Sequence, residues 1–234
     1  MAERVGFSKT IEAEWLHQAA ELSIQGISRE DASKTLTDII GQRLSNASDV
    51  RTARAILLRT WFDNEPAILE RAKAIYNIVS PAERIAIHWS LLLTQYPIFG
   101  DLCDVMGNLF SFRDEVTSKQ IKEKIYEMRG ESGTLIASLS KNLKTMRNLG
   151  TLSASTKLSV YAVQKSGIRD CQAIGILLSA VLYSRDQKYI AWSDFIIHPA
   201  IFPFTFDGID ESHMASLPYV LLDRFDGRAV LGIC

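Results

Sequence analysis

The sequence contains few cysteines and few histidines, and neither residue type is spaced as a metal-ligand set. Cys103, Cys171 and Cys234 lie far apart, with no CxxC pair and no Cys/His pattern of the kind that binds zinc. Three widely spaced thiols do not indicate a disulfide framework, which favours a reducing, cytoplasmic setting. The histidines are scattered, with no group of cysteines or carboxylates around any of them, at His17, His88, His198 and His213. The sequence therefore predicts no metal site and no cofactor.

Sequence motifs of known catalytic chemistry are absent as well. There is no glycine-rich phosphate-binding loop, no GxSxG nucleophile motif, no HExxH zinc motif and no acidic cluster with metal-ligand spacing. Cys103 and Cys171 lie in apolar helical patterns, where burial raises the pKa of a thiol and disfavours a nucleophile. His88 lies in a similar pattern and is expected to be a core residue. The sequence predicts a protein that is not an enzyme, with a spatially assembled active site as the alternative.

No apolar run is long enough to cross a bilayer as a helix. The most apolar stretch, residues 171–183, is shorter than the roughly 20 residues that a membrane-spanning helix needs. Residues 1–11 resemble a loose leader, and they lack the basic region and apolar core of a signal peptide. The composition, 47% hydrophobic and 23% charged, is typical of a globular chain. We expect a soluble, cytoplasmic protein without membrane contact, with a monomer favoured.

Positive charge is concentrated in residues 117–169. This segment has ten basic and three acidic residues, a net charge of +7, whereas the remaining chain has 16 basic and 24 acidic residues, a net charge of −8. A near-neutral protein that gathers its positive charge in one segment presents that segment to a negatively charged partner. The contrast favours duplex DNA as the partner.

The order of predicted elements in this segment is typical of a winged helix-turn-helix. Two helical patterns are separated by GESG at 130–133, and two strand patterns follow at 151–152 and 158–163. The small polar tip between the strands, residues 153–156, corresponds to a wing. We therefore expect a mainly α protein, with an N-terminal helical bundle followed by a winged helix-turn-helix with a small β-hairpin wing.

The second helix of this motif, residues 134–149, has one apolar and one polar face. Its apolar side chains recur at three- and four-residue spacing, at Leu135, Ile136, Leu139, Leu143, Met146 and Leu149. The opposite face carries small and polar side chains suited to a major groove, namely Ala137, Lys141, Lys144 and Asn148, flanked by Ser140 and Thr145. Gly150 follows as the expected helix C-cap.

The remaining chain predicts further helices and one hairpin. Helical patterns cover residues 12–24, 28–44, 49–62, 66–79, 80–95, 98–110 and 171–183, with caps expected at Ser28, Ser48 and Ser80. Residues 189–195 fit either a helix or a strand, and residues 219–222 and 228–233 could pair around the turn Asp226-Gly227. We expect an N-terminal helical domain at 1–79, a winged-helix domain at 80–184 and an extension of uncertain role at 185–234.

The third helical pattern carries arginines that allow two interpretations. Arg51 and Arg54 could extend a phosphate-binding strip beside the winged helix. They could instead pair with Asp63, Glu65 or Glu70 in a surface network, and this interpretation is favoured.

The sequence predicts a non-catalytic protein that binds double-stranded DNA. Lys141, Lys144, Thr145 and Asn148 would face the groove, Lys119, Lys122, Lys124, Arg147 and Lys157 would contact phosphates, and Arg51 and Arg54 could add to them. One alternative is a scaffold whose winged helix docks another protein subunit. A second alternative is a helical protein that binds RNA.

Three stretches add a resemblance to a known family. Residues 48–54 read SDVRTAR, residues 96–102 read YPIFGDL after an apolar helix, and residues 143–152 read LKTMRNLGTL. In their order and content they resemble the BrxA family, accessory proteins of bacterial BREX phage-defence systems, over roughly residues 20–160. The resemblance implies double-stranded DNA binding without known catalysis, a role in phage defence, and other defence-system proteins as partners. It implies no catalytic residues.

Overall fold

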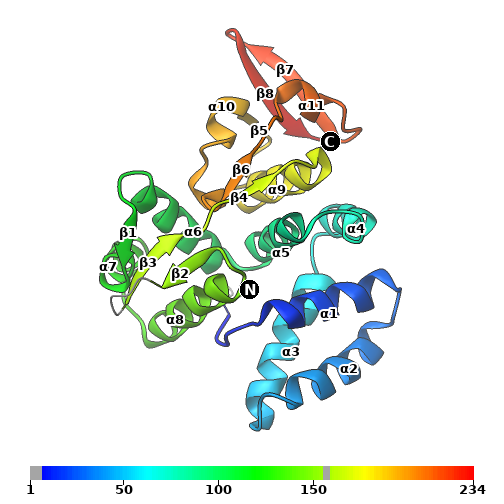
Figure 1. Cartoon of the computed structure of the whole chain (residues 1–234), viewed down its shortest axis with the longest axis vertical. Helices are drawn as coiled ribbons and strands as arrows, with labels where there is room; N and C mark the ends of the chain where they lie inside the picture. The colour runs from blue at the N-terminus through cyan, green and yellow to red at the C-terminus, as the bar shows by residue number, and fades with distance from the viewer. Residues whose placement is uncertain (1–6, 155–158) are drawn as a thin grey trace.

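The computed structural model describes residues 7–154 and 159–234 of the chain. Helices dominate these residues and the strands form small sheets, so the prediction of a mainly α protein is confirmed (Figure 1). In the part of the chain so described, no helix combines the length and the apolar character needed to cross a membrane. Lys157 and residues 155–156 of the predicted polar tip lie outside the described residues, and residues 153–154 of that tip belong to a strand instead.

Six helices occupy the first half of the chain in close agreement with the apolar periodicity. They are α1 (Ala13–Ile24), α2 (Arg29–Gly41), α3 (Ala47–Trp61), α4 (Pro66–Ile75), α5 (Pro81–Gln95) and α6 (Pro97–Phe110). The predicted caps Ser28 and Ser80 are confirmed, since their hydroxyls accept hydrogen bonds from the amides of the third residue that follows. The predicted cap Ser48 is wrong, because Asn46 caps α3 by accepting a hydrogen bond from the Ser48 amide at 2.8 Å.

The segment with the positive charge forms two helices and a small antiparallel sheet. Its elements are β1 (Glu115–Thr117), α7 (Ser118–Arg129), α8 (Gly133–Asn148), β2 (Leu152–Ala154) and β3 (Val160–Val163). The strand order is β1-β3-β2, so the strand that precedes both helices pairs with β3, which follows them. The sequence did not predict β1, because three residues are too short to show an alternating pattern.

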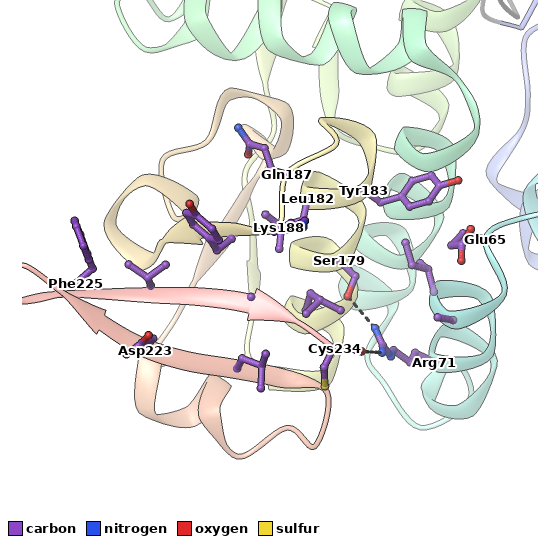
Figure 2. Close-up of a pocket in the computed structure, with 17 residues that line it drawn as sticks. Glu65, Arg71, Ser179, Leu182, Tyr183, Gln187, Lys188, Asp223, Phe225 and Cys234 are labelled. Atoms are coloured by element: carbon purple, nitrogen blue, oxygen red, sulfur yellow. Dashed lines mark hydrogen bonds between the residues drawn. The ribbon is translucent and has the colours of Figure 1, made fainter.

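The C-terminal part combines one buried helix with short strands. It contains β4 (Ser166–Ile168), α9 (Cys171–Ser184), β5 (Tyr189–Ala191), α10 (Trp192–Phe195), η1 (Pro199–Ile201), β6 (Phe204–Phe206), α11 (Glu211–Ala215), β7 (Val220–Phe225) and β8 (Arg228–Ile233). β4 and β6 are parallel, and β5, β8 and β7 form a second antiparallel sheet beside α9 (Figure 2). The predicted hairpin is confirmed: Asp226 and Gly227, with φ of 50° and 75°, form its turn.

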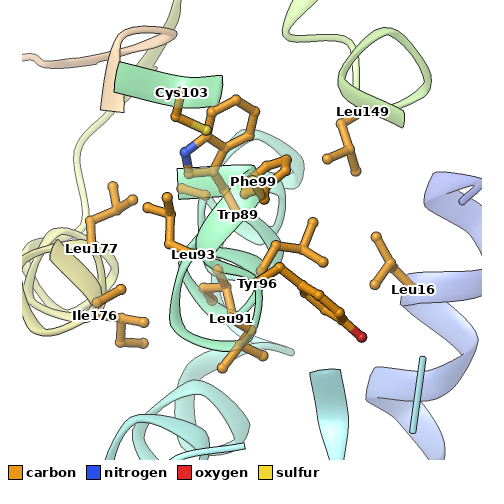
Figure 3. Close-up of a cluster of buried hydrophobic side chains, with 14 of the residues drawn as sticks. Leu16, Trp89, Leu91, Leu93, Tyr96, Phe99, Cys103, Leu149, Ile176 and Leu177 are labelled. Atoms are coloured by element: carbon orange, nitrogen blue, oxygen red, sulfur yellow. The ribbon is translucent and has the colours of Figure 1, made fainter. Parts of the chain in front are cut away.

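The buried side chains form one cluster that includes residues from all three predicted domains. Figure 3 shows aromatic and aliphatic side chains of α5 and α6 between α9 on one side and Leu16 of α1 and Leu149, which follows α8, on the other. Trp89 is fully buried at the centre of α5 and donates a hydrogen bond to the Ala200 carbonyl at 2.9 Å. The central position expected for the helix at 80–95 follows from its apolar side chains, which face in most directions.

Candidate nucleic-acid interface

The orientation of α7 and α8 is fixed by residues at their ends. Thr117 and Gln120 form a capping box at the start of α7, and Gly130 ends this helix with φ of 74°. Ser132 caps α8, and Gly150 follows it with φ of 73°. Thr151 then donates a hydrogen bond from its hydroxyl to the Met146 carbonyl at 2.8 Å. The turn between the helices and the entry into β2 are therefore set locally.

One face of α8 packs into the core as its periodicity predicted. The buried side chains are Leu135, Leu139, Leu143, Met146 and Leu149, which belong to the same buried cluster as Ile121 and Ile125 of α7 and Val116 of β1. Ile136 differs from the prediction, since 36% of its surface is exposed near the start of α8. The helix is thus held in place by four turns of apolar contacts.

Thr145 and Asn148 do not lie on an open surface, and this part of the prediction is corrected. Thr145 is fully buried, and its hydroxyl accepts a hydrogen bond from the Ile11 amide at 2.9 Å. Asn148 is half-buried and donates from its side-chain amide to the Ile11 carbonyl at 3.1 Å. Both side chains therefore hold the N-terminal segment and are not available to a groove.

The described part of the N-terminal segment is packed on α8, which corrects the expected loose leader. Phe7 and Ile11 are buried. Ser138 and Asn142 both donate hydrogen bonds to the Phe7 carbonyl at 3.3 Å. Lys9 forms an ion pair with Asp49 at the start of α3, with 2.5 Å between nitrogen and oxygen. The segment therefore connects α8 to the N-terminal helices. No periodic pattern in the sequence predicted this contact.

A third face of α8 is open to solvent and carries the positive charge. Ala137, Ser140, Lys144 and Arg147 are exposed at spacings of three and four residues, and Lys141 lies half-buried beside them. Among the described residues no carboxylate pairs with Lys141, Lys144 or Arg147. We call these five residues the α8 cationic face.

The sheet of β1, β3 and β2 follows the C-terminal end of α8. Tyr161 on β3 is half-buried, and burial raises the pKa of its hydroxyl, while the charge of Arg147 lowers that pKa. Arg147 is therefore close enough to β3 for its charge to act on Tyr161. Arg147, which was predicted to contact phosphate, lies in the last turn of α8.

The lysines of α7 differ in their partners. Lys119 pairs with Glu123 at 3.8 Å and Lys124 pairs with Glu127 at 2.7 Å, both on the helix surface. Lys122 has no carboxylate partner in the described residues. Exposed ion pairs of this kind are weak, so Lys119 and Lys124 remain able to contact a phosphate.

Arg51 and Arg54 lie on α3, among the N-terminal helices that Figure 1 shows to the side of α8 away from α7. Arg54 donates a hydrogen bond to the Thr37 hydroxyl at 2.8 Å. The favoured interpretation, in which these arginines pair with Asp63, Glu65 or Glu70, is wrong. Asp63 pairs with Arg29, and Glu70 pairs with Lys73. The two arginines instead line a shallow surface pocket between α2 and α3.

A buried group of ring side chains was not anticipated and is not arranged for metal binding. The Trp61 indole can only donate, and it donates to Nδ1 of His88 at 3.1 Å. His88 therefore carries its proton on Nε2, which lies 2.9 Å from the Tyr76 hydroxyl. That hydroxyl in turn contacts His17. A protonated Nε2 cannot bind a metal, and within the described residues no group of three or more metal-binding side chains occurs. The core role expected for His88 agrees with its complete burial.

Comparisons of the chain with protein-family models, with curated proteins and with solved structures found no match. They therefore add nothing to the resemblance to the BrxA family.

Proposed function

We propose that α6, β1, α7, α8, β2 and β3 form a winged helix-turn-helix that binds double-stranded DNA without catalysis. The strand order β1-β3-β2 supports the proposal, because it encloses α7 and α8 between the first strand and a two-stranded wing. The observation that carries it is the α8 cationic face. Helix α8 of the basic segment has three faces. One face packs into the core, a second is covered by the N-terminal segment, and the third is open and carries unpaired cations.

The open face fits the major groove in its size as well as its charge. Ala137 and Ser140 are small and lie towards the N-terminal half of α8, so the helix backbone can approach the bases closely. Lys144 and Arg147 extend from the next turns and reach phosphates or base edges. Lys122 supplies a further phosphate contact from α7. Because lysines act mainly as point charges, we infer modest sequence specificity.

The biological setting in phage defence, with other defence proteins as partners, rests on the resemblance alone. A protein-docking role for the same motif is the second candidate. It is favoured by two exposed apolar side chains near the turn between the helices, Met128 at 56% and Ile136 at 36% exposure. A docked subunit would cover these side chains.

The test is binding to a random-sequence DNA duplex, measured by fluorescence anisotropy across a salt series. Each neutralised phosphate contributes about −0.9 to the log–log slope of affinity against salt. The double variant Lys144→Ala/Arg147→Ala should therefore bind more weakly. The log–log slope of its affinity against salt should be less steep by the contribution of about two phosphates.

The control is Lys34→Ala/Arg224→Ala, which removes the same two charges from α2 and β7. It should bind like the unmodified protein if the interface is local. No duplex binding at low salt would refute the DNA proposal and direct the search to protein partners. Tighter binding to single-stranded RNA than to the duplex would favour the RNA alternative.

A further inference from the structure

The rings of Trp61, His88, Tyr76 and His17, which we call the ring chain, are joined by hydrogen bonds that run in one direction. The Trp61 indole donates to Nδ1 of His88 at 3.1 Å, so the neutral His88 imidazole has its proton on Nε2. That nitrogen lies 2.9 Å from the Tyr76 hydroxyl oxygen, which accepts the proton. The hydroxyl proton of Tyr76 then has Nδ1 of His17 as its acceptor. The ring chain therefore ends at the lone pair of this nitrogen.

The ring chain connects four helices, and solvent reaches it at His17. Trp61 is the last residue of α3, Tyr76 follows α4, His88 lies in α5 and His17 lies in α1. Trp61 and His88 are completely buried and Tyr76 is 1% exposed, whereas His17 is only half-buried. Among these four rings, His17 is thus the one that can take up a proton from water.

A proton on Nδ1 of His17 is incompatible with the ring chain. It would face the hydroxyl proton of Tyr76, and it would also face the Nε2 proton of His88, because the two ring nitrogens are 3.2 Å apart. His88 cannot adjust by changing its tautomer, since the Trp61 N–H occupies its Nδ1. Tyr76 would be left with a buried hydroxyl proton that has no acceptor in the ring chain, which is unfavourable. The inward position of His17 therefore accommodates the neutral imidazole alone.

The protonated imidazole has acceptors on the surface of α1. Glu14 precedes His17 by three residues and Glu21 follows it by four, so both exposed carboxylates share its side of the helix. Burial lowers the pKa of His17; the charge of Glu14 raises it, that of Arg84 lowers it and that of Glu21 raises it. Arg84 belongs to α5, and its guanidinium lies over the Tyr76 ring, 5.3 Å from the centroid. An imidazolium at position 17 is therefore repelled on the inner side and attracted on the outer side.

We propose that His17 is a pH-sensitive switch with two positions. The neutral imidazole points inward and accepts the hydroxyl proton of Tyr76. The imidazolium turns outward to Glu14 and Glu21, which ends the contact between α1 and the ring chain. Acidification thereby loosens α1 against α4 and α5. The inference does not depend on DNA binding.

The test is an NMR titration of the full chain, labelled with ¹⁵N at histidine and tryptophan, from about pH 8 to about pH 5. At the upper limit, His17 and His88 should each hold one proton, on Nε2. On acidification His17 should gain a second proton while His88 keeps one, and the Trp61 indole signal should shift with the midpoint of His17. A proton on Nδ1 of His17 at the upper limit, a His17 that stays neutral throughout, or a Trp61 signal that does not follow it would each overturn the proposal.

The outward position is tested with Glu14→Gln/Glu21→Gln. This double variant should lower the titration midpoint of His17 by about half a pH unit, as two exposed pairs at this helical spacing predict. The control is Glu30→Gln/Glu127→Gln, which removes two exposed charges from α2 and α7 and should leave the midpoint unchanged. An equal midpoint in the two double variants would refute the outward position.

The sensor itself is tested with His17→Gln. The glutamine amide oxygen can accept the hydroxyl proton of Tyr76 and does not titrate. The Trp61 indole signal of this variant should therefore stay constant between the two pH limits, and a shift like that of the unmodified protein would place the sensor elsewhere. Circular dichroism checks that the variant is folded. If it is not, the Glu14→Gln/Glu21→Gln variant decides, because it leaves the ring chain intact.

Discussion

Replacement of Glu83 by alanine is expected to destabilise the protein by about 3 kcal/mol, well beyond the loss of a helix cap. Glu83 is 6% exposed and closes the capping box of α5 by accepting a hydrogen bond from the Ser80 amide at 2.8 Å. Its other oxygen accepts hydrogen bonds from the Arg169 and Asp170 amides at 3.0 and 2.9 Å. These two donors lie at the start of α9, so one carboxylate joins the first turns of two core helices.

The magnitude follows from the three lost hydrogen bonds. A buried hydrogen bond to a charged acceptor contributes about 1.5–3 kcal/mol. Ser80 and Arg169 are exposed and Asp170 is half-buried, so water can replace part of each bond, and about 1 kcal/mol for each is the appropriate figure. Glu83→Gln keeps one acceptor oxygen, so it should lose either the cap or the bridge and cost about half as much.

The measurement is urea unfolding followed by tryptophan fluorescence and circular dichroism. A loss of about 3 kcal/mol corresponds to a decrease of roughly 6–12 °C in the melting temperature. Ser80→Ala removes the cap alone and should cost about 1 kcal/mol, and Glu30→Ala on the exposed first turn of α2 should have little effect. A Glu83→Ala variant no less stable than Ser80→Ala would refute the bridge between α5 and α9.

The same carboxylate predicts a dependence on pH. Burial alone would raise the pKa of Glu83, but the hydrogen bonds from Ser80, Arg169 and Asp170 lower it below its ordinary value. A lowered carboxyl pKa contributes stability above the unfolded-state pKa, and this contribution is lost as the pH falls through the folded-state pKa. The stability difference between the original protein and Glu83→Gln should therefore shrink in acid.

Two further perturbations test the core. Burial lowers the pKa of both His17 and His88. Below about pH 6.5 the unfolded chain therefore binds more protons than the folded one. The urea midpoint should decrease between pH 7 and pH 5, and an unchanged midpoint would contradict the buried network of His17 and His88. Gly107→Ala should cost about 3 kcal/mol or more, because its new carbon would lie 2.2 Å from the Pro199 carbonyl oxygen, whereas Gly41→Ala, with nothing within 4 Å, should be neutral or slightly stabilising in thermal melts.

The helices were predictable because their signals are local. Apolar spacing and the caps Ser28 and Ser80 depend on residues within one or two turns of each other, and the structure confirms them. The failure at Ser48 is also local, since Asn46 and Ser48 are both good caps and only one can begin the helix. Where two candidates lie two residues apart, sequence alone does not decide between them.

The candidate interface was harder to predict because its polar residues have two uses. Thr145 and Asn148 lie on the non-apolar side of α8, and periodicity cannot distinguish a polar side chain that faces water from one that holds another segment. The partner, Ile11, is more than 130 positions away and belongs to a segment too short to show a period. The cations Lys144 and Arg147 were identified correctly as exposed because long charged side chains are rarely buried without partners.

The three faces of α8 explain why the candidate interface is narrow. Leucines cover the core side, the N-terminal segment covers a second side through Thr145 and its neighbours, and the stripe from Ala137 to Arg147 remains open. Loss of the contact with the N-terminal segment would expose the buried side chains of Phe7 and Ile11 to water, so widening the stripe in this way has a free-energy cost. Packing of the N-terminal segment, which contains Phe7 and Ile11, therefore fixes the rotation of α8 about its axis. That rotation in turn determines which cations of α8 are directed towards β3, where the charge of Arg147 lowers the pKa of Tyr161.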